Sequence, residues 1–132
     1  MDVALNKTER PSGERIVLVD KQGKASETRF ALLEDLGKFS LIQAKPVTGR
    51  THQIRVHAKH CLCPLLGDDK YSDINADQAI LQRLKIKTFM LHAQKLSFTL
   101  PESEERMQVE APIPEKMNQV INILRNEKLR EN

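Results

Sequence analysis

The hydrophobic period of the chain changes near residue 51, and this change constrains the fold more than any other feature. Before that point, short runs rich in β-branched and aromatic residues alternate with turn residues, as in strands joined by hairpins. After it, apolar residues recur at the spacing of a helix. The expected strands are Arg15–Val19, Glu27–Leu33 and Phe39–Ala44, and the expected helix is Thr51–Cys61, which ends before Pro64 and buries Ile54, Ala58, Cys61 and Leu62.

Later segments add more strands and helices to this pattern. Residues 1–13 show no periodic pattern of apolar residues and end in Pro-Ser-Gly, so we expect a loop or tail there. The sequence as a whole predicts a single α+β domain over residues 1–132, built as an antiparallel mixed sheet with flanking helices. The further expected elements are a short helix carrying Ala79, Ile80 and Leu84 and capped by Asp73 or Asn75, a β-hairpin within residues 89–109, and a terminal helix carrying Met117, Val120, Ile121 and Leu124.

Composition argues against a membrane-spanning or secreted protein. The chain has 132 residues, of which 39% are hydrophobic, and it contains no apolar run near the roughly 20 residues that span a bilayer. The first residues have no apolar region of the kind that marks a secretory signal. The only cysteines are Cys61 and Cys63, which are too close together for a disulfide that would cross-link the fold. We expect both to be thiols. These observations predict a cytoplasmic protein without a membrane partner.

Charge is distributed unevenly along the chain. The net charge of +3 is too small to identify a partner by itself. Residues 36–67, however, contain no Asp or Glu, whereas acidic residues gather from position 102 onward. We therefore expect a locally basic face. The cations and histidines of the acid-free stretch are Lys38, Lys45, Arg50, His52, Arg55, His57, Lys59 and His60.

The densest group of chemistry-bearing residues is the segment Pro46–His57, where a strand leads through a glycine into a helix. The start of a helix presents unpaired N–H groups and a positive dipole end, which favour an anion. Helical geometry places His52, Arg55 and Lys59 on a face turned away from the predicted apolar side. From the residues alone, this is an anion site of unknown ligand, and the alternative is that Arg50 and Arg55 only solvate the helix end or pair with internal acids.

The stretch Thr48–His57 resembles the third motif of the pseudouridine synthases that act on ribosomal and transfer RNA. Three further stretches follow in the family's order and approximate spacing: Gly67–Tyr71, Leu91–Ala93 and Glu110–Pro114. Upstream, Lys24–Phe30 looks like a stretch of a family member that modifies the large ribosomal subunit. The resemblance covers nearly the whole chain and implies the carboxy-terminal half of the family's catalytic domain.

The resemblance also implies roles for individual residues. In this family an aspartate attacks a flipped-out uridine and breaks its glycosidic bond, so that the base can rotate and rejoin through carbon. Arg55 corresponds to the basic residue that pairs with this aspartate, and Leu91 to an apolar residue that packs near the target base. Arg50, His52 and Lys59 are expected to contact structured RNA, with uridine in large-subunit ribosomal RNA as the substrate. The resemblance implies no cofactor and no metal.

Parts of the family's pattern are absent from this sequence. The nucleophilic aspartate belongs to a motif that reads roughly His-Arg-Leu-Asp, and the nearest match here is Arg83-Leu84-Lys85. The family's active-site tyrosine precedes the third motif, whereas the only tyrosine, Tyr71, follows it and is expected to be a packing residue. We therefore expect a fragment that is inactive alone and that associates with the missing half or with itself. The alternative is an inert RNA-binding or assembly module, and a small-molecule phosphate-binding domain ranks behind both.

Other residues allow competing interpretations. Asp68 and Asp69 could be a catalytic carboxylate pair, but adjacent residues that follow a glycine more often shape a turn. Arg125–Arg130 could touch RNA, although the alternating glutamates favour a solvated helix face. Four residues of the types that bind zinc lie close together in the sequence. No second pair of such residues follows at zinc-finger spacing, so no structural metal is expected. This group consists of His57, His60, Cys61 and Cys63.

Overall fold

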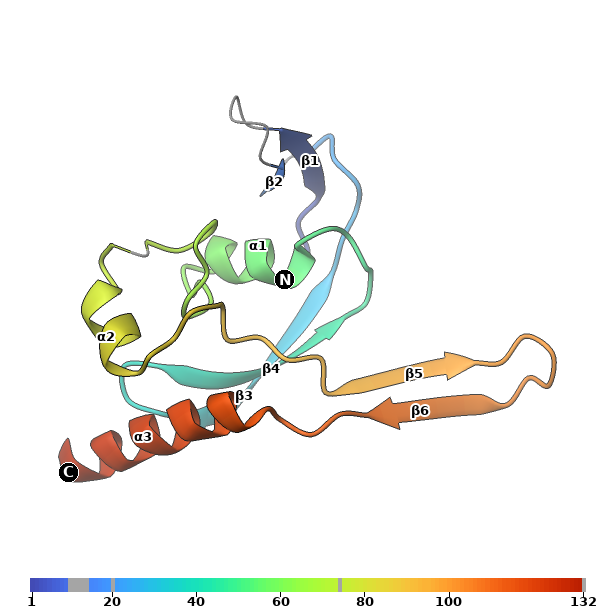
Figure 1. Cartoon of the computed structure of the whole chain (residues 1–132). Helices are drawn as coiled ribbons and strands as arrows, with labels where there is room; N and C mark the ends of the chain where they lie inside the picture. Colours follow the sequence, from blue (N-terminus) through green and yellow to red (C-terminus); the bar gives the residue numbers. More distant parts are fainter. Residues whose placement is uncertain (10–14, 20, 74, 132) are drawn as a thin grey trace. The chain divides into compact units, whose positions relative to one another are not determined.

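The computed structural model describes residues 1–9, 15–19, 21–73 and 75–131. Its internal contacts divide the chain into two compact units, Met1–Met90 and Leu91–Asn132, and each is described by itself (Figure 1). Helices and antiparallel strands occur in both, which confirms the predicted α+β class. That the two units form one domain stays a prediction.

The described residues of the first unit form two separate antiparallel strand pairs and two helices (Figure 1). Strand β1 (Leu5–Glu9) pairs with β2 (Arg15–Val19), and β3 (Thr28–Asp35) pairs with β4 (Ser40–Pro46). The turn between β3 and β4 is closed locally, because the Asp35 carboxylate accepts the N–H of Gly37 at 2.9 Å and Gly37 adopts a φ of 88°. Helices α1 (Gln53–His60) and α2 (Gln78–Arg83) follow.

The second unit is a hairpin followed by a helix. Strand β5 (Lys95–Thr99) pairs with β6 (Arg106–Glu110), and helix α3 (Glu115–Glu131) completes the unit. The register places Leu96 opposite Val109 and Phe98 opposite Met107, so one face of the hairpin is apolar. The predicted hairpin and terminal helix are confirmed. Neither α3 nor any shorter helix of the described ranges has the length and apolarity needed to cross a membrane.

Two expectations about chain segments are wrong. Leu5–Glu9 was expected to be loop or tail but forms β1, because pairing with β2 gives its backbone hydrogen-bond partners that the sequence does not reveal. The Pro-Ser-Gly at residues 11–13 lies outside the described residues. The residue that precedes α2 is Asp77, which makes no side-chain cap; Asp73 instead accepts the N–H of Ala76 at 3.2 Å.

The predicted buried side of α1 is also wrong in part. Ala58 is buried, but Cys61 and Leu62 lie beyond the helix end and are exposed, with Leu62 at 89%. Polar residues of the helix are buried instead, because hydrogen bonds satisfy them. Its buried residues are Gln53, Arg55, Val56, His57 and Ala58. Val56 packs in a core cluster with Leu5 and Tyr71.

Gly67 fixes the loop between α1 and α2. Its φ is +86°, and a Cβ atom there would lie 2.5 Å from the carbonyl oxygen of Thr88. Backbone in this region strains any L side chain by about 1–3 kcal/mol, and the close approach adds to that strain. By contrast, a Cβ atom at Gly49 would meet nothing within 4 Å.

We predict that Gly67→Ala lowers the free energy of unfolding by at least about 2 kcal/mol, whereas Gly49→Ala changes it by less than about 1 kcal/mol. Urea denaturation of both variants and the parent chain, followed by circular dichroism, measures this. Equal stability of the two variants would show that the loop does not require glycine at position 67.

Candidate functional site

Helix α1 begins at an unusual backbone position. His52 precedes it with φ 52° and ψ 21°, in the left-handed region, and makes no side-chain cap. Its ring Nδ1 instead lies 2.7 Å from the hydroxyl of Tyr71, and the two rings meet edge to face. The first turn of the helix is thereby tied to the loop that follows it.

One side of α1 is joined to strand β3 by a buried polar network. The amide Nε2 of Gln53 donates to the carbonyl of Glu27 at 2.6 Å and to the hydroxyl of Thr28 at 2.8 Å. Its Oε1 accepts from the hydroxyl of Thr48 and from the N–H of Arg50. Thr28 is fully buried. The network fixes the helix against the start of the strand, because leaving any of these groups unpaired would cost about 1–3 kcal/mol.

His57, one turn after Gln53, completes this network and is fully buried. The carbonyl of Val3, 3.0 Å from Nε2, can only accept, so Nε2 carries the proton. The unprotonated Nδ1 then accepts from the hydroxyl of Thr28 at 2.8 Å. Ser26 donates to the same Val3 carbonyl and lies 3.1 Å from Nε2. Burial lowers the pKa of His57, although the Val3 carbonyl acts in the opposite direction.

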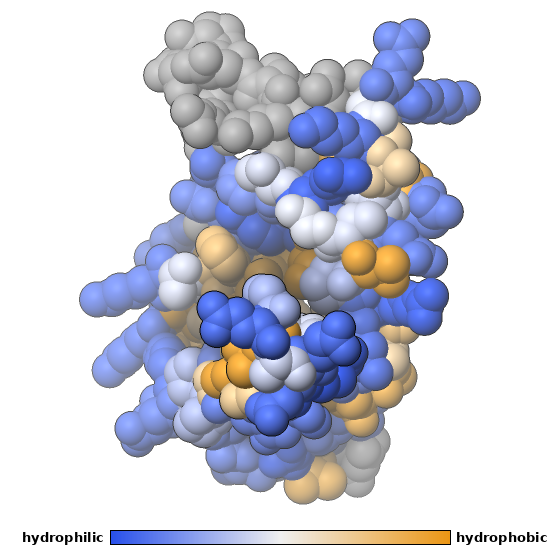
Figure 2. All heavy atoms as spheres, turned by 90° about the vertical axis from the view of Figure 1, so that its right-hand side faces the viewer, coloured by the Kyte–Doolittle hydropathy of each residue, from blue (hydrophilic) through white to orange (hydrophobic). Residues whose placement is uncertain are grey.

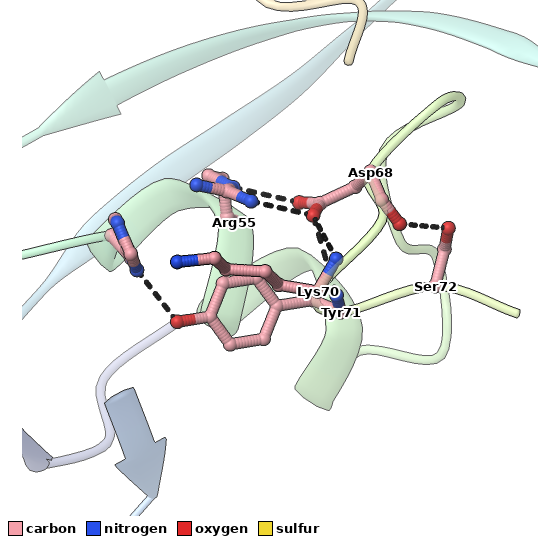
Figure 3. Close-up of polar contacts among 6 residues, drawn as sticks. Arg55, Asp68, Lys70, Tyr71 and Ser72 are labelled. Atoms are coloured by element: carbon pink, nitrogen blue, oxygen red, sulfur yellow. Dashed lines mark hydrogen bonds and ion pairs between the residues drawn. The ribbon is translucent and has the colours of Figure 1, made fainter. Parts of the chain in front are cut away.

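The opposite side of α1 carries a buried ion pair between Arg55 and Asp68 (Figure 3). Nε of Arg55 donates to Oδ2 of Asp68 at 2.8 Å, and Nη2 donates to Oδ1 at 2.7 Å. This is the two-pronged geometry that a planar guanidinium offers a carboxylate. The Asp68 side chain is fully buried, and that of Arg55 is 10% exposed.

Asp68 and two aromatic rings hold the guanidinium. Oδ1 of Asp68 also accepts the backbone N–H groups of Lys70 at 3.1 Å and Tyr71 at 3.3 Å (Figure 3). The guanidinium carbon of Arg55 lies 5.0 Å from the ring centre of Tyr71 and 4.3 Å from that of Phe89, within the range of cation–π attraction.

Both partners of the pair have shifted pKa values. The hydrogen bond to Asp68 raises the pKa of Arg55 against the effect of burial. Burial alone would raise the pKa of Asp68, but the hydrogen bonds from Arg55 and from the backbone outweigh burial and lower it. Both groups are therefore charged at neutral pH.

The predicted basic face of α1 does not form one exposed surface. Arg55 is buried, because Asp68 neutralises it, whereas Lys59 is exposed and His52 is half-buried against Tyr71. Arg50 is exposed, and its Nε donates to the carbonyl of Ala25 at 3.0 Å. Leu91 belongs to the second unit and is 39% exposed.

Several site residues were missed or only partly understood from the sequence. Asp68 does shape a turn, as predicted, but it is also the partner of Arg55. Gln53 and His57 were not predicted to bind the helix to β3, although their spacing of four places them on one side of a helix. Tyr71 is buried, which confirms its packing role.

Among the described residues, no three His, Cys, Asp or Glu side chains lie together as a metal would require. Both ring nitrogens of His57 are occupied by hydrogen bonds. Cys61 and Cys63 are free and exposed, in agreement with the expected thiols.

Comparison with known proteins relates the chain to RNA-modifying enzymes. Residues 6–60 match the family described as RNA pseudouridylate synthase. The chain is 44% identical, over 124 residues, to ribosomal large subunit pseudouridine synthase C of Pasteurella multocida, with 94% of this chain and 38% of that protein covered. The chain is homologous to part of an RNA pseudouridylate synthase. The protein of the same name from Escherichia coli is 43% identical over 116 residues, which are 87% of this chain and 36% of that one.

A solved structure agrees with this family in fold. Human RNA pseudouridylate synthase domain containing 4 superposes with a TM-score of 0.65 at 22% identity, covering 95% of this chain and 55% of that one. Identity at this level supports the shared fold alone. The chain thus spans less than two-fifths of the length of the pseudouridine synthases that it matches by sequence.

The buried His57 predicts a pH dependence of stability. In the unfolded chain a histidine binds a proton near pH 6.5, whereas the lowered pKa in the folded chain delays protonation to a lower pH. The unfolded state therefore binds more protons as the pH falls, and the free energy of unfolding should decrease from pH 7 to pH 5. Replacing His57 with Gln should flatten this slope, while the exposed His60→Gln should preserve it. Unfolding curves at several pH values that give the same slope for both variants would contradict this assignment.

Proposed function

We propose that this chain contributes one part of an active site that isomerises uridine to pseudouridine in large-subunit ribosomal RNA. The proposal is supported by homology over nearly the whole chain and by the names of the relatives. The observation that carries it is the position of Arg55, a buried guanidinium on the helix of the family's third motif.

In this proposal Arg55 orients the nucleophilic aspartate of the family. A guanidinium has five N–H donors, and the two bonds to Asp68 use Nε and Nη2. Three N–H donors remain, two of them on the edge formed by Nη1 and Nη2. A second carboxylate at that edge would be held in a fixed direction and kept ionised.

The nucleophile itself is not supplied by this sequence. The 132 residues contain no His-Arg-Leu-Asp tetrapeptide. Asp68 is a poor substitute, because both of its oxygens already accept hydrogen bonds and its side chain is fully buried. We therefore propose that the chain alone does not isomerise uridine and that the aspartate comes from a segment corresponding to the upstream part of the relatives.

The remaining residues are proposed to bind the substrate. Arg50 and Lys59 are exposed cations near the two ends of α1, and His52 lies at its start. These residues would contact RNA phosphates, and Leu91 would pack near the flipped base. Flipping costs a few kcal/mol of stacking, which such contacts must offset.

Association with a partner segment or with a second copy is also proposed. All ten residues of β5 and β6 are exposed, including apolar Leu96 at 62% and Val109 at 52%. In the first unit, Leu32 at 62% and Ile42 at 44% form an exposed cross-strand pair. Figure 2 shows apolar side chains (orange) reaching the surface among hydrophilic ones. Sedimentation over a range of concentrations would reveal self-association, and a clean monomer would contradict it.

We predict that this chain converts uridine only when it is combined with the upstream part of a relative. In that mixture, Arg55→Ala should lower single-turnover conversion of a ribosomal RNA fragment by about 100-fold, because misplacing a nucleophile by about 1 Å has an effect of that order. Affinity for the RNA should change little. Arg55→Lys should restore part of the rate, since lysine keeps the charge but lacks the fork.

Two results would contradict the proposal. Conversion by the isolated chain at the rate of the mixture would show that no external nucleophile is required. RNA binding without conversion in every mixture would instead favour the alternative function, an inert RNA-binding or assembly module.

RNA binding by the chain alone is predicted to be weak and sensitive to salt. A contact to about two phosphates predicts a slope of log K against log salt of about −1 to −2. Arg50→Ala should reduce the magnitude of this slope by nearly one unit, whereas Arg130→Ala, in the solvated α3, should leave it unchanged. Fluorescence anisotropy with a labelled RNA fragment measures both slopes. An RNA affinity that does not change with salt, or a slope that Arg50→Ala leaves unchanged, would exclude this binding mode.

A further inference from the structure

We infer that Asp68 is a positioning residue of the isomerisation site, which acts by fixing the direction in which Arg55 presents its second edge. This inference rests on the proposed function, because the carboxylate that receives the second edge is the nucleophile. It assigns to the loop after α1 a part in the chemistry that goes beyond shaping a turn.

The guanidinium of Arg55 is a rigid planar group. Asp68 binds the edge formed by Nε and Nη2 at 2.8 and 2.7 Å. In a rigid planar group, fixing one edge also fixes the plane and direction of the edge formed by Nη1 and Nη2. A long arginine side chain without such a partner could adopt several rotamers, and ordering it would cost side-chain entropy.

Asp68 is itself held by the backbone of its own loop. Its Oδ1 accepts the N–H groups of Lys70 and Tyr71, so the carboxylate is fixed to the backbone of its own loop. Its carbonyl oxygen accepts the N–H of Ser72 at 3.1 Å and also the Ser72 hydroxyl. Gly67, immediately before it, adopts the left-handed backbone that brings the loop to this position. The reference point for Arg55 is therefore the backbone rather than another mobile side chain.

Aromatic rings provide the third restraint. Tyr71 and Phe89 lie within 5.0 and 4.3 Å of the Arg55 guanidinium carbon. Tyr71 is buried, and its hydroxyl is paired with His52. Swinging of the guanidinium away from Asp68 would break both the ion pair and these contacts.

Asp68 contributes to the site mainly by orienting Arg55, because its own negative charge does not strengthen the attraction of Arg55 for a second carboxylate. A carboxylate beside Arg55 weakens the attraction of Arg55 for any second anion. This loss is limited, because Asp68 spreads its charge over four N–H donors. Pairing with Asp68 therefore reduces the attraction of Arg55 for a second anion but fixes the orientation of its guanidinium. Removal of Asp68 should therefore slow the reaction rather than weaken binding of the RNA.

The test compares two isosteric substitutions at adjacent positions. Asp68→Asn removes the buried carboxylate, and Asp69→Asn removes an exposed one with the same change of net charge. Each variant of the 132-residue chain is combined with the upstream part of a relative, and single-turnover conversion of uridine is followed with protein in excess. The amplitude reports the fraction of active protein, and the rate constant reports the positioning.

We expect Asp68→Asn to lower the rate constant about 10- to 100-fold, with RNA affinity unchanged, and Asp69→Asn to behave like the parent chain. In an Arg55→Lys background, Asp68→Asn should lower the rate constant much less, because the fork that Asp68 orients is already gone. A residue that only stabilised the fold would lower the amplitude and leave the rate constant of the active fraction unchanged.

Each remaining outcome decides the question. If the parent mixture converts uridine and Asp68→Asn has the parent rate constant, the positioning role is wrong and the proposed function stands. If the parent mixture does not convert uridine, the proposed function fails and the inference fails with it. If Asp68→Asn does not fold, Asp68→Glu decides: it keeps the charge but displaces the carboxylate, so a parent rate constant would overturn the inference and a lowered one would support it.

Discussion

The buried ion pair between Arg55 and Asp68 is the interaction on which the arrangement of the site depends. It joins helix α1 to the loop that follows it, and it does so through two short hydrogen bonds. Burial of either charge alone would be strongly unfavourable, by about 3–5 kcal/mol for a broken buried pair. The loop and the helix therefore take their positions together.

The same helix is held from its other side by neutral polar groups. Gln53 and His57 connect it to Thr28 at the start of β3, and the hydrogen bond that Nδ1 of His57 accepts from the Thr28 hydroxyl requires the uncharged form of the ring. Among the described residues, no buried side-chain nitrogen or oxygen lacks a partner. A fully satisfied network of this kind specifies one orientation of the helix, whereas an apolar face would tolerate several. Arg55 is thus presented on a helix that can neither rotate nor slide easily.

Sequence reasoning found the elements better than it found the contacts between them. Local periods predicted α1 and the later hairpin, because each depends on residues near in sequence. Arg55 was expected on a basic face of the helix, but it is buried and pairs with an internal acid, which is the alternative that the sequence left open. A helical face shows where a side chain points but not which distant group meets it. Asp68 is the first acid after an acid-free stretch of basic residues, and this signal could have identified the partner. The roles of Gln53 and His57 could not be predicted in this way, because their partners are backbone and hydroxyl groups of β3 and the segment before it.

The most direct test of the account is the side-chain nitrogen spectrum of Arg55 in the folded chain. If Asp68 holds the guanidinium, the Nε–H of Arg55 should give a separate resonance that exchanges slowly with water, and Asp68→Asn should abolish it while Asp69→Asn leaves it in place. The exposed Arg29, with 71% of its side chain accessible, serves as the internal reference for rapid exchange. Rapid exchange at Arg55 equal to that at Arg29 would contradict the account, because the group that is proposed to orient the nucleophile would not be held at all.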